Sequence, residues 1–179
     1  MAYWNSRGLR GSSLEEVINI TNEKYRQHKL ALIQKVPTPI TPIEIDKVNR
    51  HITLAYFEKK STVDYIGAVQ GIPVCFDAKE CSCDTFALQN IHDHQVKFMK
   101  EFEEQGGISF LLIYYPHRDF YYYLTLDKLL KFWNRRENGG RKSFRFDELD
   151  PEYEIRCKNS IYVHYLELIN LDISSRSNS

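Results

Sequence analysis

Ser61-Thr-Val-Asp-Tyr-Ile-Gly67 and Val74-Cys-Phe-Asp-Ala-Lys-Glu80 are the two stretches that decide the fold we expect. Apolar residues alternate or cluster along both stretches, and Gln70-Gly71 lies between them as a short turn. This pattern predicts two adjacent strands joined as a β-hairpin. The other segments of the chain are then interpreted by how they would pack around that hairpin.

Four polar side chains are expected to meet on this hairpin, because residues two apart on a strand share a face. They are Thr62 with Asp64 on the first strand and Asp77 with Lys79 on the second. Two carboxylates and a hydroxyl suit Mg²⁺, and a lysine can orient the attacking water or stabilise charge in phosphodiester hydrolysis. The same alternation also describes an ordinary solvent-facing strand, so these four residues alone leave both interpretations open.

Composition indicates a single globular domain, since 179 residues with 42% hydrophobic and 13% aromatic residues can form a core. No apolar stretch approaches the roughly 20 residues that cross a bilayer, and the first residues lack an apolar signal region. We therefore expect a cytoplasmic protein without a membrane partner. Cys75, Cys81 and Cys83 crowd around the expected site, but Cys-x-Cys without a second pair fits zinc poorly, which favours free thiols.

Charge is balanced over the whole chain, at 24 cations against 24 acids, but it is unevenly distributed. Residues 131–145 hold six cations and one acid, whereas residues 146–179 hold seven acids and three cations. The basic segment is interpreted either as a phosphate-binding surface or as a solvated face. The candidate DNA contacts are Lys59, Lys60, Arg135, Arg136, Arg141, Lys142 and Arg145.

Strand and helix patterns occur along the whole chain and predict an α/β domain. We expect helices at 13–29, 90–102 and 126–133, and strands at 30–36, 52–57, 108–115 and 120–124. Prolines in Pro37-Thr-Pro-Ile-Thr-Pro42 favour a protruding excursion from the sheet at about 37–60. The expected organisation is a flexible arm at 1–12, a nuclease domain at 13–150 and an acidic C-terminal extension at 151–179.

Two further polar residues lie on expected helices near the hairpin. Glu15 is a candidate metal ligand or general base, or alternatively an acid that complements the dipole of the first helix. His92 and Gln95 are three apart and therefore neighbours on one helix face, so that one or both could point into the site.

Several short motifs follow one another in a fixed order between about Arg7 and Leu149. They are Asn19-Ile-Thr-Asn22, Lys35-Val-Pro-Thr-Pro39, Ala55-Tyr-Phe57, Ser61-Thr-Val-Asp-Tyr65, Phe76-Asp-Ala-Lys-Glu80, His92-Asp-His-Gln95, Gly106-Gly-Ile108, Phe132-Trp-Asn-Arg135 and Gly139-Gly-Arg-Lys-Ser143. Together these motifs resemble the RecU family of Holliday junction resolvases.

The resemblance implies a restriction-endonuclease-like core, with a mixed central sheet flanked by helices, and a protruding stalk at about 37–60 that enters the junction centre. It also implies a homodimer that cleaves two opposed strands of four-way junction DNA with Mg²⁺, or with Mn²⁺ as a substitute. Such an enzyme would act in recombination and repair at the bacterial nucleoid, with a recombinase as a further partner.

The resemblance assigns metal and catalytic roles to Thr62, Asp64, Asp77 and Lys79, and supporting roles to Glu15 and Gln95. Family members usually have glutamate where this chain has Asp77, and Cys81-Ser-Cys83 is unlike the polar loop of the family. Two alternatives stay open: a related nuclease that acts on another DNA structure, and a non-catalytic junction-binding recombination factor.

Overall fold

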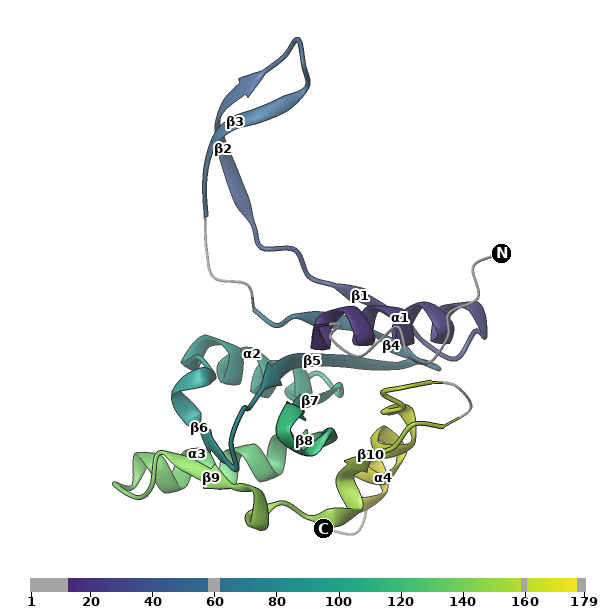
Figure 1. The fold of residues 1–179 in the computed structure, drawn as a ribbon, viewed down its shortest axis with the longest axis vertical. Coiled ribbons are helices and arrows are strands. Elements are labelled where there is room, and N and C mark those ends of the chain that lie inside the picture. Colours follow the sequence, from purple (N-terminus) through teal and green to yellow (C-terminus); the bar gives the residue numbers. More distant parts are fainter. Residues whose placement is uncertain (1–12, 58–61, 159–160, 177–179) are drawn as a thin grey trace.

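A six-stranded mixed sheet runs through the centre of the protein (Figure 1), in a computed structural model that describes residues 13–57, 62–158 and 161–176. In spatial order its strands are β1 (Leu32–Lys35), β4 (Tyr65–Val69), β5 (Ile72–Glu80), β7 (Ile108–Tyr115), β8 (Phe120–Thr125) and β10 (Glu154–Ile155). Only β5 and β7 pair in parallel within this sheet. The helices are α1 (Leu14–Gln27), α2 (Asp93–Glu104), α3 (Leu126–Glu137) and α4 (Leu166–Arg176). The expected mixed sheet flanked by helices is confirmed.

The hairpin formed by β4 and β5 is confirmed in the register from Tyr65 opposite Phe76 to Val69 opposite Ile72. Its turn holds Gln70 and Gly71 at φ of 48° and 92°, the positive values that a tight hairpin turn requires. One expectation is wrong in detail: Thr62 and Asp64 precede β4 and lie in a bend, rather than on the strand. Their placement therefore depends on the connection into β4 and not on strand alternation.

A row of stacked aromatic rings crosses four neighbouring strands on one face of the sheet. Tyr65 stacks on Phe76 at 4.7 Å between ring centroids, Phe76 on Phe110 at 4.7 Å, and Phe110 on Tyr123 at 4.2 Å. Each such pair contributes about 0.5–1.5 kcal/mol beyond the burial of its area. Tyr165 covers this row, with its ring 5.2 Å from that of Phe76 and 5.7 Å from that of Phe110.

The core continues through the expected boundary at residue 150. The strand β10 pairs with β8 at the edge of the main sheet, and Tyr153, Ile155, Val163 and Tyr165 are buried in the common core. Residues 151–158 and 161–176 are thus part of the domain rather than an appended acidic segment. The excess of acids in this segment predicted an appended extension. Several of these acids form ion pairs with nearby cations.

The stalk is a two-stranded ribbon of β2 (Ile40–Asp46) and β3 (His51–Phe57) that projects far from the body (Figure 1). The strand β2 forms despite Pro42, because a ribbon strand pairs on one side only. At the tip, Oδ1 of Asp46 accepts hydrogen bonds from the backbone N–H groups of Val48 and Asn49. Large apolar side chains are exposed along the ribbon: Ile40, Ile43, Ile45, Val48, Ile52, Leu54, Tyr56 and Phe57.

Two short strands and four 3₁₀ helices complete the described chain. The strands β6 (Thr85–Ala87) and β9 (Ser143–Arg145) pair with each other, and neither was among the strands expected from the sequence. The 3₁₀ helices are η1 (Leu88–Asn90), η2 (Pro116–Arg118), η3 (Phe146–Glu148) and η4 (Pro151–Tyr153). Within the described ranges, no helix has both the length and the apolar character that a membrane crossing needs. The expected arm at 1–12 lies outside the described residues.

Replacement of Tyr165 by alanine tests whether the C-terminal segment belongs to the core. Tyr165 is fully buried and its hydroxyl donates to Oδ1 of Asn22 on α1. We expect the free energy of unfolding of Tyr165→Ala, from urea titration, to fall by about 3–5 kcal/mol. The partly buried Tyr162 provides a matched control, and Tyr162→Ala should lose about 1 kcal/mol or less. Equal, small losses in both variants would contradict this placement.

Candidate active site

Asp77 is the centre of the candidate site, and its side chain is fully buried on β5. It shares a strand face with Lys79, whose Nζ lies 2.5 Å from its Oδ2. Its Oδ1 accepts two hydrogen bonds, at 3.1 Å from the backbone N–H of Asp64 and at 3.0 Å from Nε2 of Gln95. The carboxylate is therefore fixed by groups from three separate segments.

Asp64 is tied to the same place by its own backbone and side chain. The backbone N–H of Val36 donates to the carbonyl of Asp64 at 2.8 Å, which anchors the bend beside the C-terminal end of β1. The backbone N–H of Ala78 donates to Oδ2 of Asp64 at 2.9 Å. Since the N–H of Asp64 in turn donates to Asp77, the two carboxylates are held together by reciprocal hydrogen bonds between the bend and β5.

Gln95 uses both ends of its amide at the start of α2. Its Oε1 accepts from the backbone N–H of His92 at 3.0 Å, which caps the helix, while its Nε2 donates to Asp77. Gln95 therefore points toward Asp77, and its role in the reaction stays a prediction. His92 is the N-cap residue, since α2 begins at Asp93, later than the predicted helix.

Burial raises the pKa of Asp77 to about 7, because the charged carboxylate loses its hydration, and the nearby carboxylate of Asp64 adds to this effect. The ammonium group of Lys79 acts in the opposite direction but does not cancel the shift in the pKa. Among the described residues, Oδ2 of Asp77 is paired with Nζ of Lys79 at 2.5 Å. A buried carboxylate with one lysine partner, beside a second carboxylate, has the chemistry of a hard divalent cation site, because a bound cation can supply the counter-charge in place of the ammonium group.

Among the described residues, no hydrogen bond or ion pair joins the two remaining predicted residues, Glu15 and Thr62, to the cluster around Asp77. Glu15 lies on α1 and forms an ion pair with Lys35, while its carbonyl accepts from the hydroxyl of Tyr65. Thr62 is exposed in the bend two residues before Asp64. Roles of Glu15 and Thr62 in metal binding or catalysis stay predictions.

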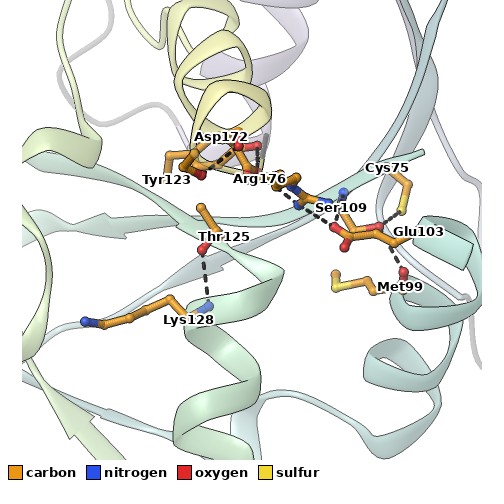
Figure 2. Close-up of polar contacts among 10 residues, drawn as sticks. Cys75, Met99, Glu103, Ser109, Tyr123, Thr125, Lys128, Asp172 and Arg176 are labelled. Carbon is orange, nitrogen blue, oxygen red and sulfur yellow. Dashed lines mark hydrogen bonds and ion pairs between the residues drawn. The ribbon is translucent and has the colours of Figure 1, made fainter. Parts of the chain in front are cut away.

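The other end of α2 is held by a partly buried polar network that sequence reasoning missed (Figure 2). Oε1 of Glu103 accepts from the backbone N–H of Ser109 at 3.0 Å and from Nη2 of Arg176 at 2.7 Å. Nε of Arg176 donates to Asp172 at 2.8 Å, and Asp172 accepts from the hydroxyl of Tyr123 at 2.9 Å. The helix that carries Gln95 is thereby fixed to β7, β8 and α4.

The predicted basic contacts are largely engaged in ion pairs within the chain. Arg135 and Arg141 both bind Glu148, Arg136 binds Asp93, and Arg145 binds Asp147. Arg135 also donates to the carbonyl of Ser143 at 2.6 Å, which indicates a structural role in the β9 region. Lys142 is exposed, whereas Lys59 and Lys60 lie outside the described residues.

A family model and the similar curated proteins name the same family. A model of the family described as "Recombination protein U", RecU, matches residues 9–171. The chain is 39% identical over 168 residues to "Holliday junction resolvase RecU" of Pediococcus pentosaceus, covering 91% of this chain and 84% of that protein. It is 40% identical over 165 residues to the protein of the same name from Bacillus subtilis, covering 89% of this chain and 79% of that one.

A solved structure of Hjc, described as a Holliday junction resolvase from Archaeoglobus fulgidus, is similar at a TM-score of 0.38 and 11% identity. The match covers 68% of this chain and 75% of that chain.

Replacing Asp77 with asparagine should reveal its raised pKa as a pH-dependent difference in stability. In the metal-free protein, the folded-state pKa of about 7 lies above the ordinary value of 3.8, so the folded state binds the proton more tightly than the unfolded state. The free energy of unfolding of the wild type should therefore fall, relative to that of Asp77→Asn, as the pH rises from about 4 to about 7.

The measurement is a urea titration of both proteins in chelator at about pH 5 and pH 8. Asp127→Asn, at an exposed carboxylate on α3, controls for the change in net charge. A constant difference between wild type and Asp77→Asn at the two pH values would contradict the assignment of the raised pKa to Asp77.

Proposed function

The chain belongs to the RecU family, and on that premise we propose that it is an endonuclease that resolves four-way, or Holliday, DNA junctions in recombination and repair. The observation that supports this activity most directly is the buried carboxylate of Asp77 held against Asp64 and Lys79. The proposed reaction is metal-dependent hydrolysis of a phosphodiester bond in each of two opposed strands.

We propose Mg²⁺ as the cofactor, with Mn²⁺ as a substitute, bound by Asp64 and Asp77 and completed by Thr62. Carboxylate and hydroxyl oxygens are the ligands that these hard cations prefer. When bound, the cation supplies charge stabilisation at the phosphoryl oxygens and an activated water. The burial of Asp77 beside Asp64 supports this assignment, since two neighbouring carboxylates away from water are unfavourable without a cation between them.

The residues of the chain orient these groups. Gln95 and the N–H of Asp64 hold Oδ1 of Asp77, and this leaves Oδ2, which lies 2.5 Å from Nζ of Lys79, as the proposed ligand atom. The side chain of Lys79 is 21% exposed and can place its Nζ on the attacking water or on a phosphoryl oxygen. Glu15, on α1 beside Tyr65, is proposed as a supporting acid or base.

Selection of the substrate is proposed to depend on shape. The stalk presents exposed apolar side chains, such as Phe57 at 75% exposure, to the centre of the junction. Lys59, Lys60, Arg136, Arg141, Lys142 and Arg145 are proposed to contact phosphates, which position DNA without reading its bases. Surface ion pairs contribute at most about 1 kcal/mol, so the arginines can exchange their acidic partners for phosphate.

A homodimer is proposed because two-fold symmetry presents two identical sites to a junction of roughly the same symmetry. The proposed setting is the bacterial cytoplasm at the nucleoid, with a recombinase as a further partner. The alternatives make different predictions about substrate: a related nuclease would cleave forked or linear DNA as well, and a non-catalytic factor would bind junctions without nicking them.

Asp64→Asn should abolish cleavage of a labelled four-way junction while leaving junction binding nearly unchanged. Asparagine keeps the shape of the side chain but removes the charge that holds the cation, so the rate should fall by at least about 10³-fold. Cleavage is measured with Mg²⁺, with Mn²⁺ and with chelator, beside a matched linear duplex, and binding is measured in Ca²⁺.

Asp127→Asn, far along the chain on α3, is the matched control and should cleave like the wild type. Paired nicks by Asp64→Asn would refute the role of Asp64. Tight binding by the wild type without nicks in either metal would instead favour the non-catalytic alternative.

The double variant Arg141→Ala/Lys142→Ala should weaken junction binding and flatten its salt dependence. Each phosphate contact that is lost lowers the slope of log K against log salt by about 0.9, because one fewer counterion is released. Binding is measured by fluorescence anisotropy at several salt concentrations. Arg156→Ala, at an exposed arginine paired with Glu154 elsewhere on the surface, is the control. An unchanged slope in the double variant would place the DNA surface elsewhere.

A further inference from the structure

Two cysteine thiols lie together in the loop that follows β5. The thiol of Cys81 donates to the carbonyl of Cys83 at 3.0 Å and to the carbonyl of Thr85 at 3.6 Å. The thiol of Cys83 donates to the same carbonyl of Thr85 at 3.3 Å. Because both sulfur atoms share one acceptor, they converge on a single point of the loop, in a motif that the proposed nuclease reaction does not use.

The loop that carries these thiols is anchored at both ends. The backbone N–H of Cys81 donates to the carbonyl of Tyr114 at 2.8 Å, and the carbonyl of Asp84 accepts from the N–H of Phe146 at 2.7 Å. The carboxylate of Asp84 also binds Arg118 through two contacts of 2.6 Å. These contacts hold the two cysteines at a fixed separation, so one thiol reacts in the immediate presence of the other.

The two thiols differ in access to solvent. Cys83 is exposed, whereas Cys81 is 6% exposed, and its burial raises the pKa of its thiol. An incoming reagent therefore meets Cys83 first, and Cys81 is placed to react with whatever forms on it. Among the described residues no three His, Cys, Asp or Glu side chains are grouped to hold a metal ion, which favours redox chemistry over zinc at this pair.

We propose that Cys81 and Cys83 are a redox modification site, which a low-molecular-weight disulfide converts into an intramolecular disulfide. The Cys83 thiolate attacks one sulfur of the reagent, forms a mixed disulfide and releases the first thiol. Cys81 then loses its proton and attacks the sulfur of Cys83, which breaks the mixed disulfide and releases the second thiol. The protein loses two protons and two electrons, and the reagent gains them as two thiols.

The other cysteines provide internal controls for this chemistry. Cys75 is buried with its Sγ 3.3 Å from Oγ of Ser109, so it should stay unreacted while the protein is folded. Cys157 is exposed on a different segment, and it should stop at the mixed disulfide if no second thiol reaches it. The folded chain thus offers a protected thiol, an exposed comparison thiol and the proposed pair.

The test is treatment of the native protein with oxidised glutathione, alkylation of the remaining thiols and mass analysis of the peptides. The peptide that contains Cys81 and Cys83 should lose two hydrogen atoms, carry neither glutathione nor the alkylating group, and regain both thiols in excess dithiothreitol. Two glutathione molecules should be released for each loop that closes.

Two single variants separate the roles of the thiols. In Cys81→Ser, Cys83 should stop as the glutathione adduct, and in Cys83→Ser, Cys81 should remain a thiol over the same time. The Cys157→Ser background excludes intermolecular pairing through that residue. A wild-type protein in which Cys83 keeps glutathione, or in which either cysteine joins a different partner, would overturn the proposal.

Discussion

Burial of the Asp77 carboxylate is the constraint on which the other features of the site depend. An ionised carboxylate away from water is strongly unfavourable unless donors and a counter-charge surround it. Here these groups come from three places in the chain: the bend at Asp64, the helix residue Gln95 and the strand neighbour Lys79. The hairpin register, the position of α2 and the entry into β4 must all be correct at once. The network around Glu103 serves the same end, because it fixes the far end of α2 (Figure 2).

Local signals made much of the fold predictable from the sequence. The turn at Gln70-Gly71 specified the hairpin, and α1 lies within the helix expected at 13–29. Contacts between distant residues could not be predicted in this way, since the pairing of Glu103 with Arg176 spans 73 positions and has no local pattern. The place of the C-terminal segment in the core could not be predicted for the same reason. Its acids are apparent from the composition, but the burial of Tyr165 depends on rings contributed by other segments.

The basic segment shows why charge alone predicts a surface poorly. Its arginines are not a uniform patch, because Arg135 and Arg141 share Glu148 and Arg136 lies over the ring of Trp133 at 3.7 Å. Arg135 has a further contact with the backbone carbonyl of Ser143, so it is better suited to hold β9 than to exchange its acidic partner for phosphate. The aspartate at position 77 stands where family members usually have glutamate. Its shorter side chain still reaches both of its donors, because those donors come from the adjacent bend and helix.

The row of stacked rings from Tyr65 to Tyr123 also determines how long the site stays intact. Phe76 is a central member of that row, and Asp77 is the next residue on the same strand, facing the other side of the sheet. Moving the carboxylate out of place requires separation of β5 from neighbours that bury their rings on both sides of it. Local openings of this kind need nearly the full free energy of global unfolding. The backbone position of Asp77 therefore lasts as long as the folded sheet, whereas that of Asp64 also depends on the bend between the stalk and β4.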